Sequence, residues 1–256
     1  MRIFLTGASS GIGAALARYY AAQGAQLGLV ARRAEQLDAL IASLPGGHQS
    51  HLALPANVAD SESIAAAAKA FIERFGLPDI VIANAGISVG TLTEEIRDYS
   101  PFEAVLRTNV LGVVATFQPF AGAMRARGHG TLVGISSVAG VRGLPGAGAY
   151  SASKAAVSRY LESLRVELRG SGVKVVDIRP GYIATPMTDI NTYPMPFKLG
   201  SDEAARRFAR AIAHGRSQAT IPWQMAIVAR VLDVLPNALY DRLFAKAQRK
   251  PRGLPL

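Results

Sequence analysis

Residues 6–13 read Thr6-Gly-Ala-Ser-Ser-Gly-Ile-Gly13, a turn that contains three glycines. Residues 2–6 before it are mostly apolar, as in a buried strand, and residues 14–22 after it have the composition of a helix. Glycines between a strand and a helix let the backbone approach a pyrophosphate, which the N-terminus of the helix stabilises. The sequence therefore predicts a dinucleotide-binding unit at the start of the chain.

Strand and helix patterns alternate along the rest of the chain. We expect strands at residues 2–6, 26–31, 51–53, 79–83, 131–135, 173–178 and 219–221, and helices at 14–22, 34–44, 61–75, 101–127, 150–168 and 201–214. This alternation predicts an α/β fold with one Rossmann-type domain, a doubly wound parallel sheet of about seven strands with helices on both faces. We expect residues 1–221 to form this domain and residues 222–256 to be its C-terminal helical extension.

Composition limits the classes of function. Half of the 256 residues are hydrophobic and 18% are charged, so a sizeable core is available. The net charge of +10 is concentrated from Lys198 onward, where eleven Lys or Arg accompany four Asp or Glu. We expect no nucleic-acid partner, because these basic residues are confined to one segment with little aromatic interleaving. No room for a signal peptide precedes the glycine turn and no apolar run could span a membrane, so we expect a cytoplasmic protein.

The sequence offers few residues that could bind a metal or react as a thiol. The chain has no cysteine, which removes disulfides, thiol nucleophiles and thiolate metal ligands together. His48 and His51 are three residues apart, but no neighbouring acid or cysteine completes a metal site. We therefore expect no metal, and we interpret these histidines as a solvated loop pair.

Tyr150 and Lys154 are four residues apart at the start of a predicted helix, so their side chains lie on one face, one turn apart. A phenol has an unperturbed pKa of about 10, and a neighbouring ammonium favours the phenolate. The pair can thus exchange a proton with a substrate. Considered alone, a surface lysine beside a half-buried tyrosine is the simpler interpretation.

The second predicted strand ends in Ala31-Arg32-Arg33. A carboxylate at this position would bind the ribose hydroxyls of NAD, whereas an arginine accommodates the 2′-phosphate of NADP. Guanidinium groups bind phosphate through paired N–H donors. We therefore expect NADP(H) in preference to NAD(H), the simpler alternative being two surface arginines.

Together these features resemble the short-chain dehydrogenase/reductase family over about residues 1–221. The family's other motifs follow in order: Asn84-Ala-Gly86, Asn109-Val-Leu-Gly112, Ser137 thirteen residues before Tyr150, and Pro180-Gly181 with Thr185. The resemblance implies a catalytic tetrad of Asn109, Ser137, Tyr150 and Lys154. In this tetrad Tyr150 would exchange the proton, Ser137 would hydrogen-bond the substrate oxygen, Lys154 would lower the pKa of the tyrosine and bind the nicotinamide ribose, and Asn109 would hold a water.

The resemblance also implies a set of cofactor-binding residues. These are Thr6, Gly7, Ser9, Ser10, Gly11, Ile12, Gly13, Arg32, Arg33, Asn57, Val58, Asn84, Ala85, Gly86, Tyr150, Lys154, Pro180, Gly181, Ile183 and Thr185. At Asn57 the family commonly has an aspartate whose carboxylate meets the adenine amino group. Asparagine also offers an acceptor oxygen, so adenine binding should survive.

In the family, the segment after the nicotinamide-binding residues covers the substrate, which corresponds here to the loop 183–200. This loop is rich in proline and apolar residues. Its apolar side chains would form an adaptable wall of the substrate pocket, the alternative being the packing of an ordered surface loop. The pocket residues that we expect are Met187, Tyr193, Met195 and Phe197.

The extension contains an apolar stretch at 225–235, a second amphipathic stretch at 239–247 and basic residues at 248–252. Amphipathic helices usually cover cores, so we expect packing on the protein's own subunits. The alternative is peripheral contact with an anionic membrane surface. The resemblance implies a homodimer or homotetramer.

The expected function is therefore that of an NADP(H)-dependent oxidoreductase. It would reduce a ketone or aldehyde of an apolar or lipid-like substrate, or oxidise the matching secondary alcohol, with tyrosine as acid and base. Two alternatives stay open. One is a 3-oxoacyl thioester reductase with the same tetrad, and the other is an NADP-sensing regulatory protein whose chemistry is vestigial.

Overall fold

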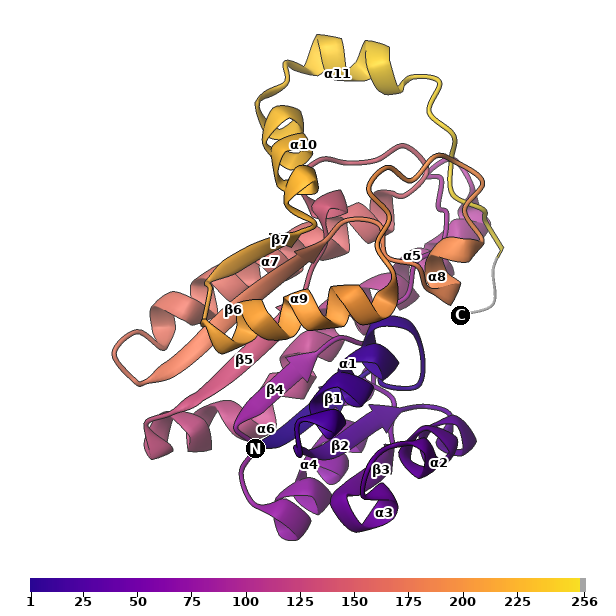
Figure 1. Ribbon diagram of the computed structural model, residues 1–256. Helices are drawn as coiled ribbons and strands as arrows, with labels where there is room; N and C mark the ends of the chain where they lie inside the picture. The colour runs from indigo at the N-terminus through magenta and orange to yellow at the C-terminus, as the bar shows by residue number, and fades with distance from the viewer. Residues whose placement is uncertain (254–256) are drawn as a thin grey trace.

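A seven-stranded parallel sheet forms the centre of the protein in the computed structural model, which describes residues 1–253 (Figure 1). Its order is β3-β2-β1-β4-β5-β6-β7. The strands are β1 (Arg2–Thr6), β2 (Gln26–Ala31), β3 (His51–Pro55), β4 (Ile80–Ala83), β5 (Gly130–Ile135), β6 (Val173–Pro180) and β7 (Gln218–Ile221). The order runs outward from β1 to one edge and from β4 to the other, so the expected doubly wound sheet is confirmed, with its switch point between β1 and β4.

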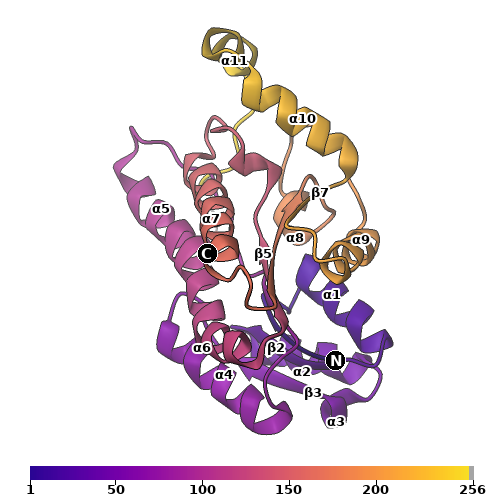
Figure 2. The ribbon, with the colours of Figure 1, turned by 90° about the vertical axis from the view of Figure 1, so that its left-hand side faces the viewer.

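Helices cover both faces of the sheet (Figure 2). One face carries α1 (Gly11–Ala22), α2 (Ala34–Ser43) and α9 (Ser201–Ala213), and the other carries α4 (Ser61–Phe75), α6 (Gly112–Arg127) and α7 (Gly148–Glu167). Successive side chains of a strand point to opposite faces. Ile3 and Leu5 accordingly belong to the core under α1 and α9, whereas Phe4 packs with Phe71 and Phe120 on the other face.

The long helix expected at 101–127 is divided in the structure. It consists of α5 (Tyr99–Leu106), a π-helical turn η2 (Arg107–Leu111) and α6. A π turn widens the helix locally, and such turns are frequent at functional sites. This turn contains Asn109, whose position no periodicity in the sequence could have revealed.

Several short elements were not predicted. They are α3 (Gly47–Ser50), α8 (Pro186–Asp189) and the 3-10 turns η1 (Ile96–Asp98) and η3 (Val138–Gly140). A capping box between Thr185 and Thr188, with proline at the first helical position, explains why α8 forms inside a loop expected to be irregular.

The interpretation of His51 as solvated is wrong. Its side chain is buried at the start of β3, and its Nε2 donates to the Pro45 carbonyl oxygen at 2.9 Å. Burial lowers the pKa of this imidazole. His48, in α3, is exposed as expected.

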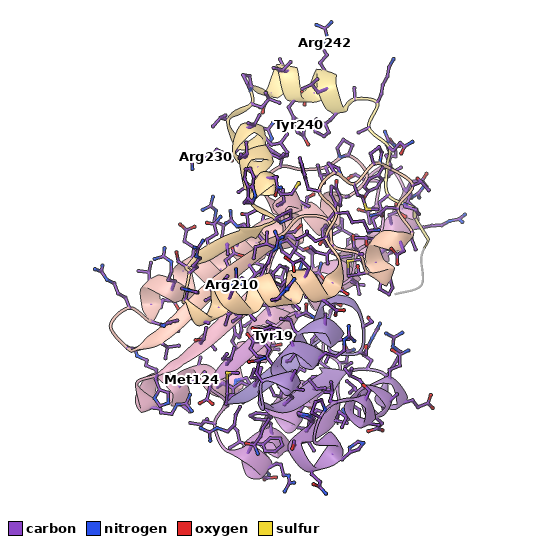
Figure 3. All side chains as sticks on the ribbon, viewed as in Figure 1. Tyr19, Met124, Arg210, Arg230, Tyr240 and Arg242 are labelled. Atoms are coloured by element: carbon purple, nitrogen blue, oxygen red, sulfur yellow. The ribbon has the colours of Figure 1, made fainter. Side chains whose placement is uncertain are left out.

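The C-terminal extension forms α10 (Trp223–Val234) and α11 (Asn237–Phe244), which project from the body before the chain returns toward the start of α5 (Figure 1). Tyr240 is buried, and its hydroxyl donates to the Gly143 carbonyl oxygen at 2.7 Å. Arg242 points away from the body on the opposite side of α11 (Figure 3). One side of the extension thus packs on its own chain, and the expected packing between subunits stays a prediction. Among residues 1–253, no helix has both the length and the apolar character that crossing a membrane requires.

Candidate active site

A cavity of about 260 Å³ follows the carboxyl ends of the strands. It passes the switch point between β1 and β4, where ligands bind in doubly wound sheets. The glycine turn and the two adjacent arginines line one part of it, and Ser137, Tyr150 and Lys154 line another. The sheet therefore brings together side chains that are more than a hundred residues apart in the sequence.

The shape of the glycine turn depends on backbone conformations and a close approach that require glycine. Gly7 and Gly11 have φ of 67° and 53°, a region that favours glycine, and a Cβ at Gly13 would overlap the Gly7 carbonyl oxygen. Asn84 fixes the turn to β4, since its Nδ2 donates to the carbonyl oxygens of Thr6 and Gly7 at 3.1 Å each. The first N–H groups of α1 have no partner within the helix and are directed to this end of the cavity.

Arg32 and Arg33 are exposed and line the cavity beside the glycine turn. Arg33 Nη2 donates to Ser9 Oγ at 3.3 Å, which connects the tip of β2 with the turn. The two guanidiniums, the serine hydroxyl and the helix N-terminus together favour a phosphate group.

Ser137 and Tyr150 come from neighbouring elements. Ser137 follows β5, and its Oγ accepts from the Ala139 N–H at 3.1 Å and donates to the Pro180 carbonyl oxygen at 3.5 Å. Tyr150 lies in the first turn of α7. Burial raises the pKa of the Tyr150 phenol, and a hydrogen bond with the Ser137 hydroxyl lowers it by less. The phenol is thus a proton donor at neutral pH.

Lys154 lies one turn further along α7, and this residue is 5% exposed. Its Nζ donates to the Ile135 carbonyl oxygen at 2.8 Å and lies 5.7 Å from the centre of the Tyr150 ring. Burial lowers the pKa of Lys154 to about 8. Burial and the Ser137 hydroxyl account for the shift of the tyrosine pKa, and the ammonium of Lys154 makes no contribution to it, so the expected lowering by Lys154 is not observed in the structure.

Asn109 is fully buried in the π turn and does not line the cavity. Its Oδ1 accepts from the Ile87 N–H at 2.8 Å, and its Nδ2 donates to the Ile87 carbonyl oxygen and to Ser153 Oγ, each at 3.0 Å. Each polar atom of this side chain is therefore used to hold the segment after β4 against α7.

The family model for short chain dehydrogenases matches residues 1–193. The chain belongs to the short-chain dehydrogenase family. An uncharacterised oxidoreductase of Myxococcus xanthus is 38% identical over 237 residues, which cover 93% of each chain. The sulfoacetaldehyde reductase of Chromohalobacter salexigens is 36% identical over 204 residues, 79% of this chain and 78% of that protein.

A solved structure gives the same fold with a ligand. The L-sorbose reductase of Gluconobacter frateurii, complexed with NADPH and L-sorbose, has a TM-score of 0.77 at 25% identity and covers 86% of this chain and 94% of its own. As a short-chain dehydrogenase, this protein is an oxidoreductase of a family that acts on CH–OH and C=O groups and uses nicotinamide cofactors.

Most of the residues that we predicted to bind the cofactor in this short-chain dehydrogenase line the cavity. Thr6 and Gly13 do not: Thr6 Oγ1 accepts from the N–H groups of Asn84 and Ala85, and Gly13 allows α1 to pack on the turn. The lining residues that sequence reasoning missed are Val30, Ala31, Ala56, Ile87, Thr108, Ile135, Pro186 and Thr188. Each of them lies close in sequence to a predicted motif, and this proximity was the signal that could have identified them as lining residues.

Of the four residues expected in the substrate pocket, only Met187 lines the cavity. Tyr193 is half-buried, with its ring 6.4 Å from that of Tyr182. The sulfur of Met195 accepts from Asn191 Nδ2 at 3.7 Å, away from the cavity lining. Phe197 is 50% exposed with φ of 58° and does not line the cavity, so the structure does not place it in the pocket wall as expected.

Proposed function

We propose that this short-chain dehydrogenase is an NADP(H)-dependent carbonyl reductase, with Asn109, Ser137, Tyr150 and Lys154 as its catalytic tetrad. One observation supports the proposal most strongly. A half-buried phenol with a raised pKa, a serine hydroxyl and a lysine ammonium meet in one cavity, whose other part carries two arginines and a helix N-terminus. Such an arrangement combines a proton donor with a phosphate-binding end.

The donor groups fit a phosphorylated dinucleotide. The N–H groups of Ser9 to Ile12 would bind the pyrophosphate, and Arg32 and Arg33 would bind the 2′-phosphate. A Cβ at Gly86 would lie 3.3 Å from Asn109 Oδ1 and 3.6 Å from Lys154 Nζ, so a side chain there would crowd two residues of the proposed tetrad. When bound, the nicotinamide supplies the hydride or accepts it in the reverse direction.

The protein's own groups move the proton. As a carbonyl carbon is reduced, Tyr150 would transfer its phenolic proton to the substrate oxygen, and the ammonium of Lys154 would stabilise the resulting phenolate. The hydroxyl of Ser137 would donate to the same oxygen, where negative charge develops. Asn109 would keep the segment after β4 in place through its bonds to Ile87. The raised pKa of Tyr150 suits reduction, because the phenol begins the reaction protonated.

The substrate that we propose is an apolar ketone or aldehyde. Ile87, Ile183 and Met187 give the cavity apolar surface, and the reductases of sulfoacetaldehyde and L-sorbose named above support a carbonyl as the reacting group. A 3-oxoacyl thioester would use the same residues. Turnover of acyl thioesters without turnover of free ketones would favour that alternative.

Replacement of the proposed acid tests the function. Tyr150→Phe should lower kcat for NADPH oxidation with a carbonyl panel by about 100- to 10,000-fold. NADPH binding, followed by its fluorescence, should change by less than about threefold because the phenol is not a phosphate ligand. Tyr160→Phe is the matched control: this tyrosine lies on the same helix, stacked on Phe117 and outside the cavity.

Retention of activity in Tyr150→Phe would contradict the catalytic assignment. NADPH binding with no turnover of any carbonyl by the wild-type protein would favour the regulatory alternative.

We also propose a homodimer or homotetramer in the cytoplasm, with residues 1–221 as the catalytic domain and 222–256 as its extension. Outward-facing apolar side chains on α10 and α11 support an additional contact surface: Trp223, Ile227, Val231, Val234, Leu239 and Leu243. Sedimentation velocity tests the assembly. Co-sedimentation with anionic vesicles tests the alternative, membrane contact, which should disappear when residues 223–256 are removed.

A further inference from the structure

Asp177 on β6 is a buried carboxylate beside the proposed active site that the mechanism above does not use. The residue is 4% exposed. One oxygen, Oδ1, accepts from the Ser136 hydroxyl, and the other, Oδ2, accepts from Arg179 Nε at 2.8 Å. A buried charge is costly unless it is paired, so both contacts have a stabilising role.

The register of the sheet explains the position of this carboxylate. Asp177 is the partner of Gly134 on β5, and paired residues of parallel strands face the same side. A Cβ at Gly134 would collide with Leu161 of α7, so this side of the sheet is directed to α7. Ser136, two residues after Gly134, faces the same side and reaches Asp177.

Ser136 connects Asp177 to two residues of the proposed tetrad. It directly follows Ile135, whose carbonyl oxygen accepts from Lys154 Nζ at 2.8 Å, and it directly precedes Ser137. Its N–H donates to the Ile178 carbonyl oxygen at 2.9 Å. The side-chain bond to Asp177 is therefore a second connection that holds this end of β5 to β6.

The charge of Asp177 also acts on Lys154. Burial lowers the pKa of Lys154 to about 8, and the negative charge of Asp177 opposes this change. No carboxylate other than Asp177 contributes to the shift in the Lys154 pKa among the described residues.

The other charged groups around Asp177 surround a second, polar cavity of about 180 Å³ that Asp177 itself lines. Arg159, Glu162 and Arg165 line it from α7, Arg179 from β6, and the neutral Ser217 and Gln218 from the side of β7. Glu162 pairs with Arg159 at 2.6 Å, which leaves Arg179 as the direct ionic partner of Asp177. Neutralising Asp177 should thus lower the pKa of Lys154, whereas neutralising Arg179 should raise it.

We propose that Asp177 is a positioning residue of the active site, which fixes the Ile135–Ser137 segment through Ser136 and whose charge balances the buried ammonium of Lys154. This inference rests on the proposed reductase function. Asp177 does not line the active-site cavity, so its effect would reach the reaction through Ser136 and Lys154.

The pH profile of kcat for carbonyl reduction tests the proposal. Asp177→Asn keeps an acceptor for the Ser136 hydroxyl but removes the charge, so the alkaline limb, where Lys154 loses its proton, should shift to lower pH by about one unit. Arg179→Gln leaves Asp177 without its ionic partner and should move this limb to higher pH. Below about pH 6.5 Lys154 is protonated in the wild-type protein and in both variants, so their kcat values should agree within about threefold.

A purely structural role predicts a different pattern, in which both variants lose activity at every pH with the limb unmoved. That pattern would overturn the proposal. A shift of the alkaline limb in the same direction in the two variants would overturn it as well. If Asp177→Asn fails to fold, the shift in Arg179→Gln decides alone, because this side chain is partly exposed and its loss is tolerated more easily.

A second readout needs no turnover. The lysine ¹³Cε resonances, assigned with Lys154→Met, report the protonation of Lys154 directly, and Asp177→Asn should lower its titration midpoint. An unchanged midpoint would contradict the proposal even if the reductase is active. A lowered midpoint in a protein that reduces no carbonyl would instead place the failure in the proposed function.

Discussion

Arg33 is the side chain on which the proposed preference for NADP(H) over NAD(H) depends most. It is exposed at the end of β2 and donates to Ser9 Oγ, so its guanidinium lies between the strand tip and the glycine turn. A carboxylate there would repel a 2′-phosphate, whereas a guanidinium attracts it. The sequence shows that an arginine stands at this position, but it could not predict the contact of that arginine with Ser9.

Arg33→Ala should weaken NADPH binding by roughly 10- to 100-fold, because a charge-assisted phosphate contact is lost. The affinity for NADH, which lacks this phosphate, should change by less than about threefold. Fluorescence titration with both cofactors measures the two constants. Arg125→Ala, an exposed position on α6, serves as the control for loss of a positive charge. Equal weakening of NADPH and NADH binding would contradict the assignment of Arg33.

Tyr150 and Asn109 show the limit of residue-level reasoning. The spacing of Tyr150 and Lys154 on one helix face follows from the sequence, but the direction of the phenol's pKa follows from burial. Asn109 could be assigned by resemblance alone, and its three hydrogen bonds to Ile87 and Ser153 depend on how α7 and the segment after β4 meet.

Among the elements, the strand–turn–helix unit of β1 and α1 is the most constrained. Gly13 lies inside α1, where its lack of a side chain lets the helix start approach the Gly7 carbonyl oxygen. Gly122 lies inside α6 with open space around it. The same substitution at these two helical glycines should therefore have opposite effects.

Gly13→Ala should lower the free energy of unfolding by about 1–3 kcal/mol, as overpacking does, and should abolish NADPH binding by displacing the turn. Gly122→Ala should raise the free energy of unfolding by up to about 1 kcal/mol, because alanine is the better helix former. Urea titrations of both variants measure these changes. Similar behaviour of the two variants would show that the Gly13 contact is unimportant.

At the scale of the whole molecule, the C-terminal segment joins parts of the chain that are far apart in sequence. The Gly90 N–H donates to the Pro251 carbonyl oxygen at 2.9 Å, and Arg252 pairs with Asp98 at 2.7 Å and with Glu95 at 3.2 Å. Pro251 and Arg252 are thereby fastened to the loop that follows β4, whose first residues line the cavity.

Arg252→Ala should release this segment, because it removes the side chain that bonds both carboxylates. Limited proteolysis should then cleave the segment after α11 severalfold faster, with the melting temperature of the protein unchanged. Arg242→Ala, which removes the same charge from a side chain that points away from the body (Figure 3), should not alter the cleavage rate. Unaltered cleavage of Arg252→Ala would mean that other contacts hold the segment.

The sequence by itself determined the alternation of strands and helices, the glycine turn, the arginines at the end of β2 and the spacing of Tyr150 and Lys154. These features are local, since a period or a spacing of a few residues encodes each of them. Only the tertiary structure decided the π turn around Asn109, the raised pKa of Tyr150, the exposed position of Phe197 and the contact of Ser136 with Asp177. Burial and contacts between distant segments produce these features, and the carboxyl edge of the sheet is where glycine turn, serine, tyrosine and lysine first become one site.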